Sequence, residues 1–242
     1  NMESKENTVT VYRASADDKR KFLSRTYAWM GLALVLSAVC AYAAAVSPAI
    51  FNLIWGRGAI GFIILAVAEL AVVWIFSATI RKMSVGGAIF CFILYSVING
   101  LTLSSIFFAY HINTIAYCFL GAAVMFGAMS IYGSVTKSSL ASAGHYLMMG
   151  LIGVILVSLI NMLVTFILKM SLGWVEWLIS LATVVIFTGL TAFDSQKILK
   201  AANRADSSDA YKKLAIYGAL ELYLDFINIF LSLLRLFGRN RD

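Results

Sequence analysis

Charged residues are scarce in this 242-residue chain, at 13%, whereas hydrophobic residues make up 61%. Soluble proteins have roughly 25% charged and 45–50% apolar residues. The single proline leaves long apolar segments free to form uninterrupted helices. The two histidines are too few for the clustered ligands of a metal-dependent hydrolase. These shortages predict an integral membrane protein built from helices, and they do not favour an enzyme.

Cysteine is also rare. Cys40, Cys91 and Cys118 all lie inside hydrophobic segments, and their number and spacing indicate neither a disulfide framework nor a metal site. We interpret them as small buried apolar residues, and we expect no cofactor. The net charge is +7, but the basic residues gather at the ends of apolar segments. There they set topology and contact anionic headgroups, so the expected partner is the lipid bilayer and not nucleic acid.

Seven apolar segments are long enough to cross a bilayer, which needs about 20 residues. We predict spanning helices at 26–46, 59–80, 85–110, 115–135, 145–168, 175–199 and 211–237. The fourth is rich in glycine and alanine, which permits close helix contact. We expect loops at 47–58, where Pro48 interrupts the pattern, and at 137–144 and 200–210. Residues 1–25 are predicted to be a polar cytoplasmic tail, and residues 26–238 a single seven-helix membrane domain.

Orientation follows from the distribution of lysine and arginine. Most of the 19 basic residues lie in the tail or near the connections after the second, fourth and sixth spans. The other connections carry only Arg57 and Lys169. The positive-inside rule therefore predicts a cytoplasmic N-terminus. Seven spans place Arg235, Arg239 and Arg241 outside, against the rule, whereas a last segment that dips in and returns would keep them inside.

The last span carries a polar stripe. Glu221, Asp225, Asn228, Ser232 and Arg235 are spaced by three or four residues, so they share one side of a helix. The opposite side is apolar. A carboxylate at the centre of a spanning helix costs at least about 2.5–3.5 kcal/mol on insertion scales. We therefore expect the stripe to line the middle of a helical bundle.

A second buried acid, Asp194, lies near the end of the sixth span. The following span carries Asp225. Counted from the predicted helix ends, their depths differ by about 10 Å, and fraying of the last helix to Leu214 would let the two carboxyls meet. Two carboxyls that meet in an apolar site do not both ionise easily, so they hold one proton as a unit. Loss of that proton produces repulsion and frees oxygen ligands for Ca²⁺. This pattern predicts a pH-gated cation path, although a hydroxyl, amide or arginine could instead satisfy each aspartate.

The segments LTAFDSQ (190–196) and ALELYLDFINIFLSLLRLFG (219–238) resemble the paired signature of the Bax inhibitor family, the transmembrane Bax-inhibitor-motif proteins. SSIFFAY (104–110) and FGAMSIYG (126–133) are similar to segments of its bacterial members. The resemblance covers nearly the whole chain after Thr26. It implies a seven-helix fold in which the last helix is central and is wrapped by the other six. It also implies a pH-sensitive calcium leak in a bacterial inner membrane.

By motif match, the resemblance identifies Asp194 and Asp225 as a di-aspartate pH sensor and as the candidate calcium ligands. Some members use an arginine at the end of the second helix as a latch to the first aspartate, and Arg81 is the nearest candidate here. Glu69 matches an acidic position in some members. Glu221 stands where a hydroxyl or small residue is more usual, and it adds a third acid to the stripe.

Buried acids also serve other functions. Intramembrane aspartyl proteases carry YD and GxGD motifs that this chain lacks, and a retinal protein needs a lysine in its last helix, where residues 214–237 have none. Two alternatives stay open. A membrane interaction protein that modulates a membrane-bound ATP-dependent protease would use the tail at 1–25 as its handle. A proton-coupled transporter would use the same acids as the leak.

Overall fold

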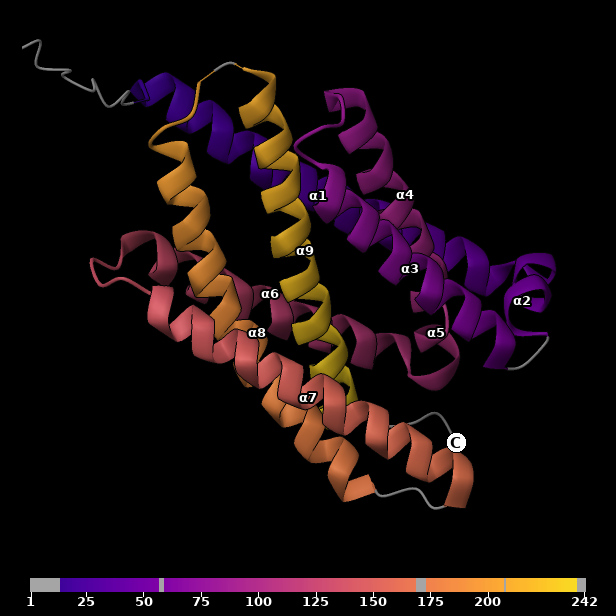
Figure 1. Cartoon of the computed structure of the whole chain (residues 1–242). Helices are drawn as coiled ribbons and strands as arrows, with labels where there is room; N and C mark the ends of the chain where they lie inside the picture. The colour runs from indigo at the N-terminus through magenta and orange to yellow at the C-terminus, as the bar shows by residue number, and fades with distance from the viewer. Residues whose placement is uncertain (1–13, 57–58, 169–172, 207, 239–242) are drawn as a thin grey trace, which may run out of the picture.

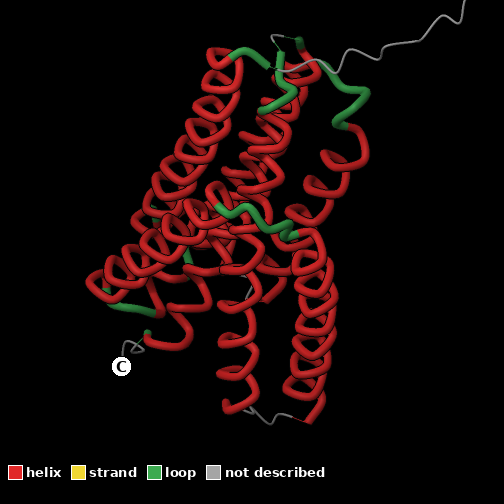
Figure 2. Tube along the Cα trace, turned by 90° about the vertical axis from the view of Figure 1, so that its left-hand side faces the viewer, coloured by secondary structure: helices red, strands yellow, loops and turns green. Residues whose placement is uncertain are grey.

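The computed structural model describes residues 14–56, 59–168, 173–206 and 208–238. These residues are helical almost throughout and are joined by short connections (Figure 2). Seven segments are long and apolar enough to cross a membrane, which confirms the predicted all-α integral membrane fold. The described helices are α1 (Ala16–Val46), α2 (Pro48–Trp55), α3 (Ala59–Thr79), α4 (Val85–Leu103), α5 (Ile106–Ala109), α6 (Ile112–Val135), α7 (Ala141–Leu168), α8 (Gly173–Ala202) and α9 (Asp209–Phe237).

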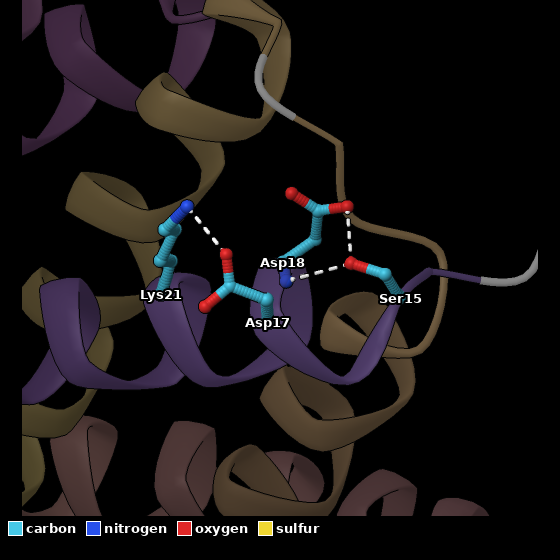
Figure 3. Close-up of polar contacts among 4 residues, drawn as sticks. All are labelled: Ser15, Asp17, Asp18 and Lys21. Carbon is cyan, nitrogen blue, oxygen red and sulfur yellow. Dashed lines mark hydrogen bonds and ion pairs between the residues drawn. The ribbon is translucent and has the colours of Figure 1, made fainter.

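α1 begins well before its apolar run, because Ser15 caps it. The Ser15 hydroxyl accepts a hydrogen bond from the Asp18 amide at 3.0 Å and donates one to the Asp18 carboxylate at 2.7 Å (Figure 3). Lys21 pairs with Asp17 one turn away, at 2.5 Å. A helix of this length extends about 46 Å, more than the 30 Å core of a bilayer, so its charged first turns lie outside that core. Much of the predicted tail is thus helical, and its residues 1–13 lie outside the described part of the chain.

Two connections differ from the sequence prediction. The predicted loop at 47–58 contains the helix α2, because Ser47 caps it and Pro48 occupies the first position, where a missing amide hydrogen is not needed. The predicted helix at 85–110 is broken into α4 and α5. At the break, the hydroxyls of Ser104 and Ser105 donate to the carbonyls of Leu101 and Thr102, at 2.6 and 3.0 Å. Serine side chains there compete with the helical backbone bonds.

The later boundaries differ from the prediction by a few residues each. α7 begins at Ala141, so the predicted loop at 137–144 is shorter. α8 runs on to Ala202 and α9 begins at Asp209, which reduces the connection to 203–208. α9 is one unbroken helix from Asp209 to Phe237. These residues therefore do not dip into the membrane and return. Arg57 and Lys169 lie outside the described residues.

One end of the bundle collects the start of α1 and the α8–α9 connection. The Ala14 amide donates to the Asn203 carbonyl at 3.0 Å. The turn after α3 lies there too, because the Lys213 ammonium donates to the Arg81 and Met83 carbonyls at 3.0 Å each. We call this the basic end.

α9 is the most buried of the seven spans. It passes between α8 on one side and α1 with α4 on the other (Figure 1). Its main neighbours are α8, α1, α6 and α4, whereas α3 packs chiefly on α4 and α7 chiefly on α8. The expectation that all six other spans wrap the last helix is therefore not confirmed.

Close helix contact in the α6–α8 pair occurs at Gly133, near the end of the glycine-rich segment. A Cβ at this position would lie 2.1 Å from the Ala192 carbonyl oxygen, so only glycine lets the two backbones approach. Gly127 is different, because a Cβ there would meet nothing within 4 Å. The contact fixes α8 against α6 two residues before Asp194.

We expect Gly133→Ala to destabilise the protein by about 1–3 kcal/mol, because the added methyl group forces backbone displacement in a packed interface. Gly127→Ala is the matched control, and it should be neutral or stabilising, by about 1 kcal/mol at most. Unfolding midpoints of the two purified variants in detergent measure the difference. Equal midpoints would contradict the assigned α6–α8 contact.

Candidate functional site

The candidate site lies between α8 and α9, which run antiparallel on either side of residues 203–208. Facing residues lie at similar chain distances from Ser208, the last residue of this connection. Ile198 would lie 3.1 Å from a Cβ at Gly218, and Lys197 contacts Glu221. By this register Asp194 lies opposite residues 222–224, between the levels of Glu221 and Asp225, so Asp225 is only about 2–5 Å away from it along the axis.

The two aspartates therefore approach one another without any fraying of the last helix. α9 is helical from Asp209, and the estimate of about 10 Å was too large because it assumed that α8 ends and α9 begins at the same level. By the Ile198–Gly218 contact, Ala202 at the end of α8 lies opposite Leu214, five residues into α9, so the two helix ends are not level.

Asp225 is the most deeply placed acid of the site. It is 3% exposed, and its Oδ2 atom has no hydrogen-bond partner among the described residues. The charged groups around it are Asp194, Glu221 and Lys197, and the Thr191 hydroxyl faces it from α8. Buried polar atoms are nearly always satisfied, so an orphaned carboxylate oxygen indicates a proton, water or cation at this position.

Lys197 is the site residue that the sequence reasoning missed. Its ammonium lies 2.5 Å from Glu221 Oε1 on α9 and 3.8 Å from Asp194 Oδ1 on its own helix. It also stands 5.9 Å from the centre of the Tyr217 ring. The spacing in the sequence could have revealed the Asp194–Lys197 contact, because a lysine three residues after an aspartate shares its helix face. In the sequence, Lys197 is interpreted only as one of the basic residues that set topology.

This contact explains the third acid. Glu221 is paired with Lys197, so Arg235, far along α9, is not needed as its counter-ion. Arg235 instead lines a cavity of about 240 Å³ at the opposite end of the bundle, together with Tyr110 and Thr102. We call Asp194, Lys197, Glu221 and Asp225 the acid cluster.

Glu69 belongs to a different polar group, on another side of α9. Its Oε1 atom accepts hydrogen bonds from Thr102 at 2.7 Å and Asn99 at 3.4 Å. The Tyr223 hydroxyl lies 2.7 Å from Asn99 Oδ1 and 2.6 Å from the Ser37 hydroxyl. We call these five residues the Tyr223 network, and it joins α1, α3, α4 and α9. Glu69 is therefore not brought to the acid cluster.

Arg81 and Asn228 of the stripe, which we count as possible accessory residues, form no described hydrogen bond or ion pair with the aspartates. The Asn228 side-chain amide donates to the Leu224 carbonyl of its own helix at 2.8 Å. Arg81 forms no ion pair with Asp194 in the described part of the chain. It lines a cavity of about 390 Å³ at the basic end, with Lys213, Leu214 and Tyr217. Tyr217 is shared between this cavity and Lys197, so the cavity adjoins the acid cluster.

The described residues contain no group of three or more His, Cys, Asp or Glu side chains arranged to hold a metal ion. Calcium in a stable site takes six to eight oxygen ligands. Asp194 and Asp225 supply only a few, so a calcium ion here would keep much of its water.

The family model described as inhibitor of apoptosis-promoting Bax1 matches residues 19–242. The chain is 44% identical to the inner membrane protein YbhL of Escherichia coli strain K12 over 222 residues. These aligned residues make up 91% of this chain and 92% of that protein. It is 40% identical to an uncharacterized protein of Borreliella burgdorferi, over 93% of this chain and 94% of the other. It is also 36% identical to an uncharacterized membrane protein of Streptococcus pyogenes serotype M1, over 97% and 99%.

We expect Tyr223→Phe to destabilise the protein by about 1–3 kcal/mol, because it leaves Asn99 Oδ1 without its donor in a buried position. Tyr95 provides the control. Its ring packs edge-on against that of Tyr223 at 6.0 Å, but its hydroxyl has no hydrogen bond in the described contacts. Tyr95→Phe should therefore change the free energy of unfolding little. Denaturant titration of both variants tests this, and equal losses would contradict the network.

Proposed function

Because this chain belongs to the Bax inhibitor family, we propose that it is a pH-sensitive calcium leak channel of a bacterial inner membrane, gated by Asp194 and Asp225. The observation that supports this most is the position of Asp225. It is buried at the contact of two spanning helices, with one carboxylate oxygen unpartnered and Asp194 less than one turn away along the axis. Acids on adjoining spans are costly, so they are usually retained for a task.

Gating follows from the charge on the two aspartates. When a proton is held between them, the α8 and α9 helices can stay in contact. When the proton leaves, two negative charges in an apolar setting repel one another and loosen that contact. The freed oxygens then attract a hard cation such as Ca²⁺. The same carboxyls thus sense pH and receive the ion.

Calcium is the transported ion in this proposal and not a resident cofactor. A few carboxylate oxygens and the Thr191 hydroxyl replace part of its hydration shell, and water supplies the rest. A site that held the ion with a full set of protein ligands would release it slowly, whereas conduction needs binding that is weak enough to reverse. The proposed activity is therefore transport across the bilayer and not catalysis.

The basic end faces the cytoplasm in this proposal. It holds the start of α1 and the turn that carries Arg81 and Lys82. It also holds the α8–α9 connection with Arg204. Cytoplasmic segments carry an excess of lysine and arginine near the ends of spans. The acid cluster then lies in the cytoplasmic half of the membrane, next to the cavity that Arg81 and Tyr217 line.

We expect purified wild-type protein in lipid vesicles to pass Ca²⁺ at a rate that changes between pH 5 and 8. Asp194→Asn and Asp225→Asn should remove that pH dependence, because an amide neither titrates nor repels its neighbour. Initial influx, followed with an enclosed calcium indicator, provides the measurement.

Asp206→Asn is the control for this experiment. It removes the same charge, but from an exposed acid in the α8–α9 connection. Hydrogen bonds from Ser208 lower the pKa of Asp206, so its titration falls below the pH range of the assay. Flux that keeps its pH dependence in both aspartate variants would sink the sensor proposal.

Orientation can be tested separately with single cysteines in a chain whose three native cysteines are replaced by alanine. Ser139→Cys lies in the exposed α6–α7 connection, and Asn113→Cys lies at the opposite end, in the exposed first turn of α6. A membrane-impermeant maleimide added to intact bacterial spheroplasts should label the cysteine at 113 and spare the one at 139. The reverse pattern would place the N-terminus outside.

A further inference from the structure

Lys197 holds an unusual position among the charged residues of the site. Its ammonium lies 2.5 Å from Glu221 and 3.8 Å from Asp194, so one cation bridges acids of two spanning helices. Among the described ion pairs, no other lysine or arginine reaches these acids within 4 Å. Asp225 lies deeper, with its Oδ2 atom unpartnered.

The exposure of these side chains shows which of them lies nearest the surface of the protein. The Lys197 side chain is 47% exposed, whereas those of Asp194 and Glu221 are 12% and 20% exposed. The ammonium therefore lies nearer the protein surface than the acids do. Its four-carbon stem is flexible, so the head can turn outward without any change in the helix. Tyr217, which lines the cavity at the basic end, lies beneath it.

We propose that Lys197 is a tethered cation at the mouth of the acid cluster, and that a calcium ion must displace it to reach Asp225. This inference rests on the proposed leak and names the residue that regulates it. A lysine ammonium is a compact, strongly hydrated point charge, and it binds the same carboxylate oxygens that a hard cation needs. It therefore competes with calcium for the acids and also repels the ion as it approaches.

An ordinary structural ion pair would have the same geometry but different consequences. A pair that only fastens α8 to α9 would lower stability when removed and would leave calcium affinity unchanged. A competing cation, when removed, leaves the acids unneutralised and raises calcium affinity. Stability and calcium affinity are therefore measured together, and only the second distinguishes the two roles.

Lys200 provides a matched control on the same helix. It lies three residues after Lys197, but its ammonium donates to Gln196 Oε1 at 3.0 Å. Gln196 in turn binds the α6–α7 connection through Ser138 and Leu140. Lys200→Gln thus removes the same charge from the same end of α8 without touching the acid cluster.

The experiment measures calcium binding by full-length protein in detergent, from the Ca²⁺-induced rise in unfolding midpoint, and calcium influx in vesicles. Lys197→Gln should lower the half-saturating Ca²⁺ concentration by at least about tenfold, because a unit charge within a few ångströms of the site is removed. Influx at low Ca²⁺ should rise with it. Lys200→Gln should match the wild type in both measurements. Asp225→Asn added to Lys197→Gln should abolish the gain.

Lys197→Arg keeps the ion pair, so it tests the inference if the glutamine variant does not fold. A guanidinium group binds carboxylates in a forked geometry that is harder to displace than an ammonium. This variant should therefore raise the half-saturating Ca²⁺ concentration several-fold and slow influx. An unchanged or lower value would count against the tethered cation.

The results separate this inference from the proposed function. Wild-type flux that depends on Asp225, with calcium affinity unaltered in both Lys197 variants, would overturn the tethered cation alone. Equal gains in Lys197→Gln and Lys200→Gln would also overturn it, because a general charge effect would then explain the result. Tighter calcium binding in Lys197→Gln without flux in any variant would overturn the leak and retain the competition at the acids.

Discussion

Carboxyl groups buried among spanning helices need compensation, because an unpaired charge away from water costs several kcal/mol. In this protein the compensation comes from across the α8–α9 contact. Lys197 on α8 reaches Glu221 on α9, and the acids of both helices face one another around that pair. The contact depends in turn on the close approach of α8 to α6, where Gly133 meets the backbone at Ala192. Placement of the acids is thus tied to the packing of three helices.

α9 has polar groups on two sides, and they are compensated differently. Toward α8 it presents carboxyls, which are balanced by an ammonium and include one orphaned oxygen. Toward α1 and α4 it presents Tyr223, whose hydroxyl is bonded to both Ser37 and Asn99. A satisfied network stiffens the packing around it, whereas a partly satisfied one leaves room for change. The two sides therefore suit a fixed support and a movable contact, respectively.

Hydropathy predicted the seven spans well, because the length of an apolar run needs no knowledge of the neighbouring helices. Local competition was harder to predict. Pro48 reads as a break, yet with Ser47 as its cap it starts α2, and Ser104 divides a run that hydropathy treats as continuous. The partner of Glu221 was missed for another reason. Ion pairs between helices depend on register, and α9 begins about five residues before the level at which α8 ends, so depths counted from the two helix ends did not give that register.

Positive charge adjoins the cavities at both ends of α9. Arg81 and Lys213 line the cavity at the basic end, and Arg235 lines the one at the other end, beside Thr102. Clefts lined by one sign of charge raise the local concentration of ions of the opposite sign, so these mouths disfavour cations. In the proposed leak, cations are attracted only deeper, where the acids lie, and Lys197 occupies part of that region as well. In that proposal each mouth opposes the ion that the interior accepts, so the charge at both ends of α9 restrains the leak.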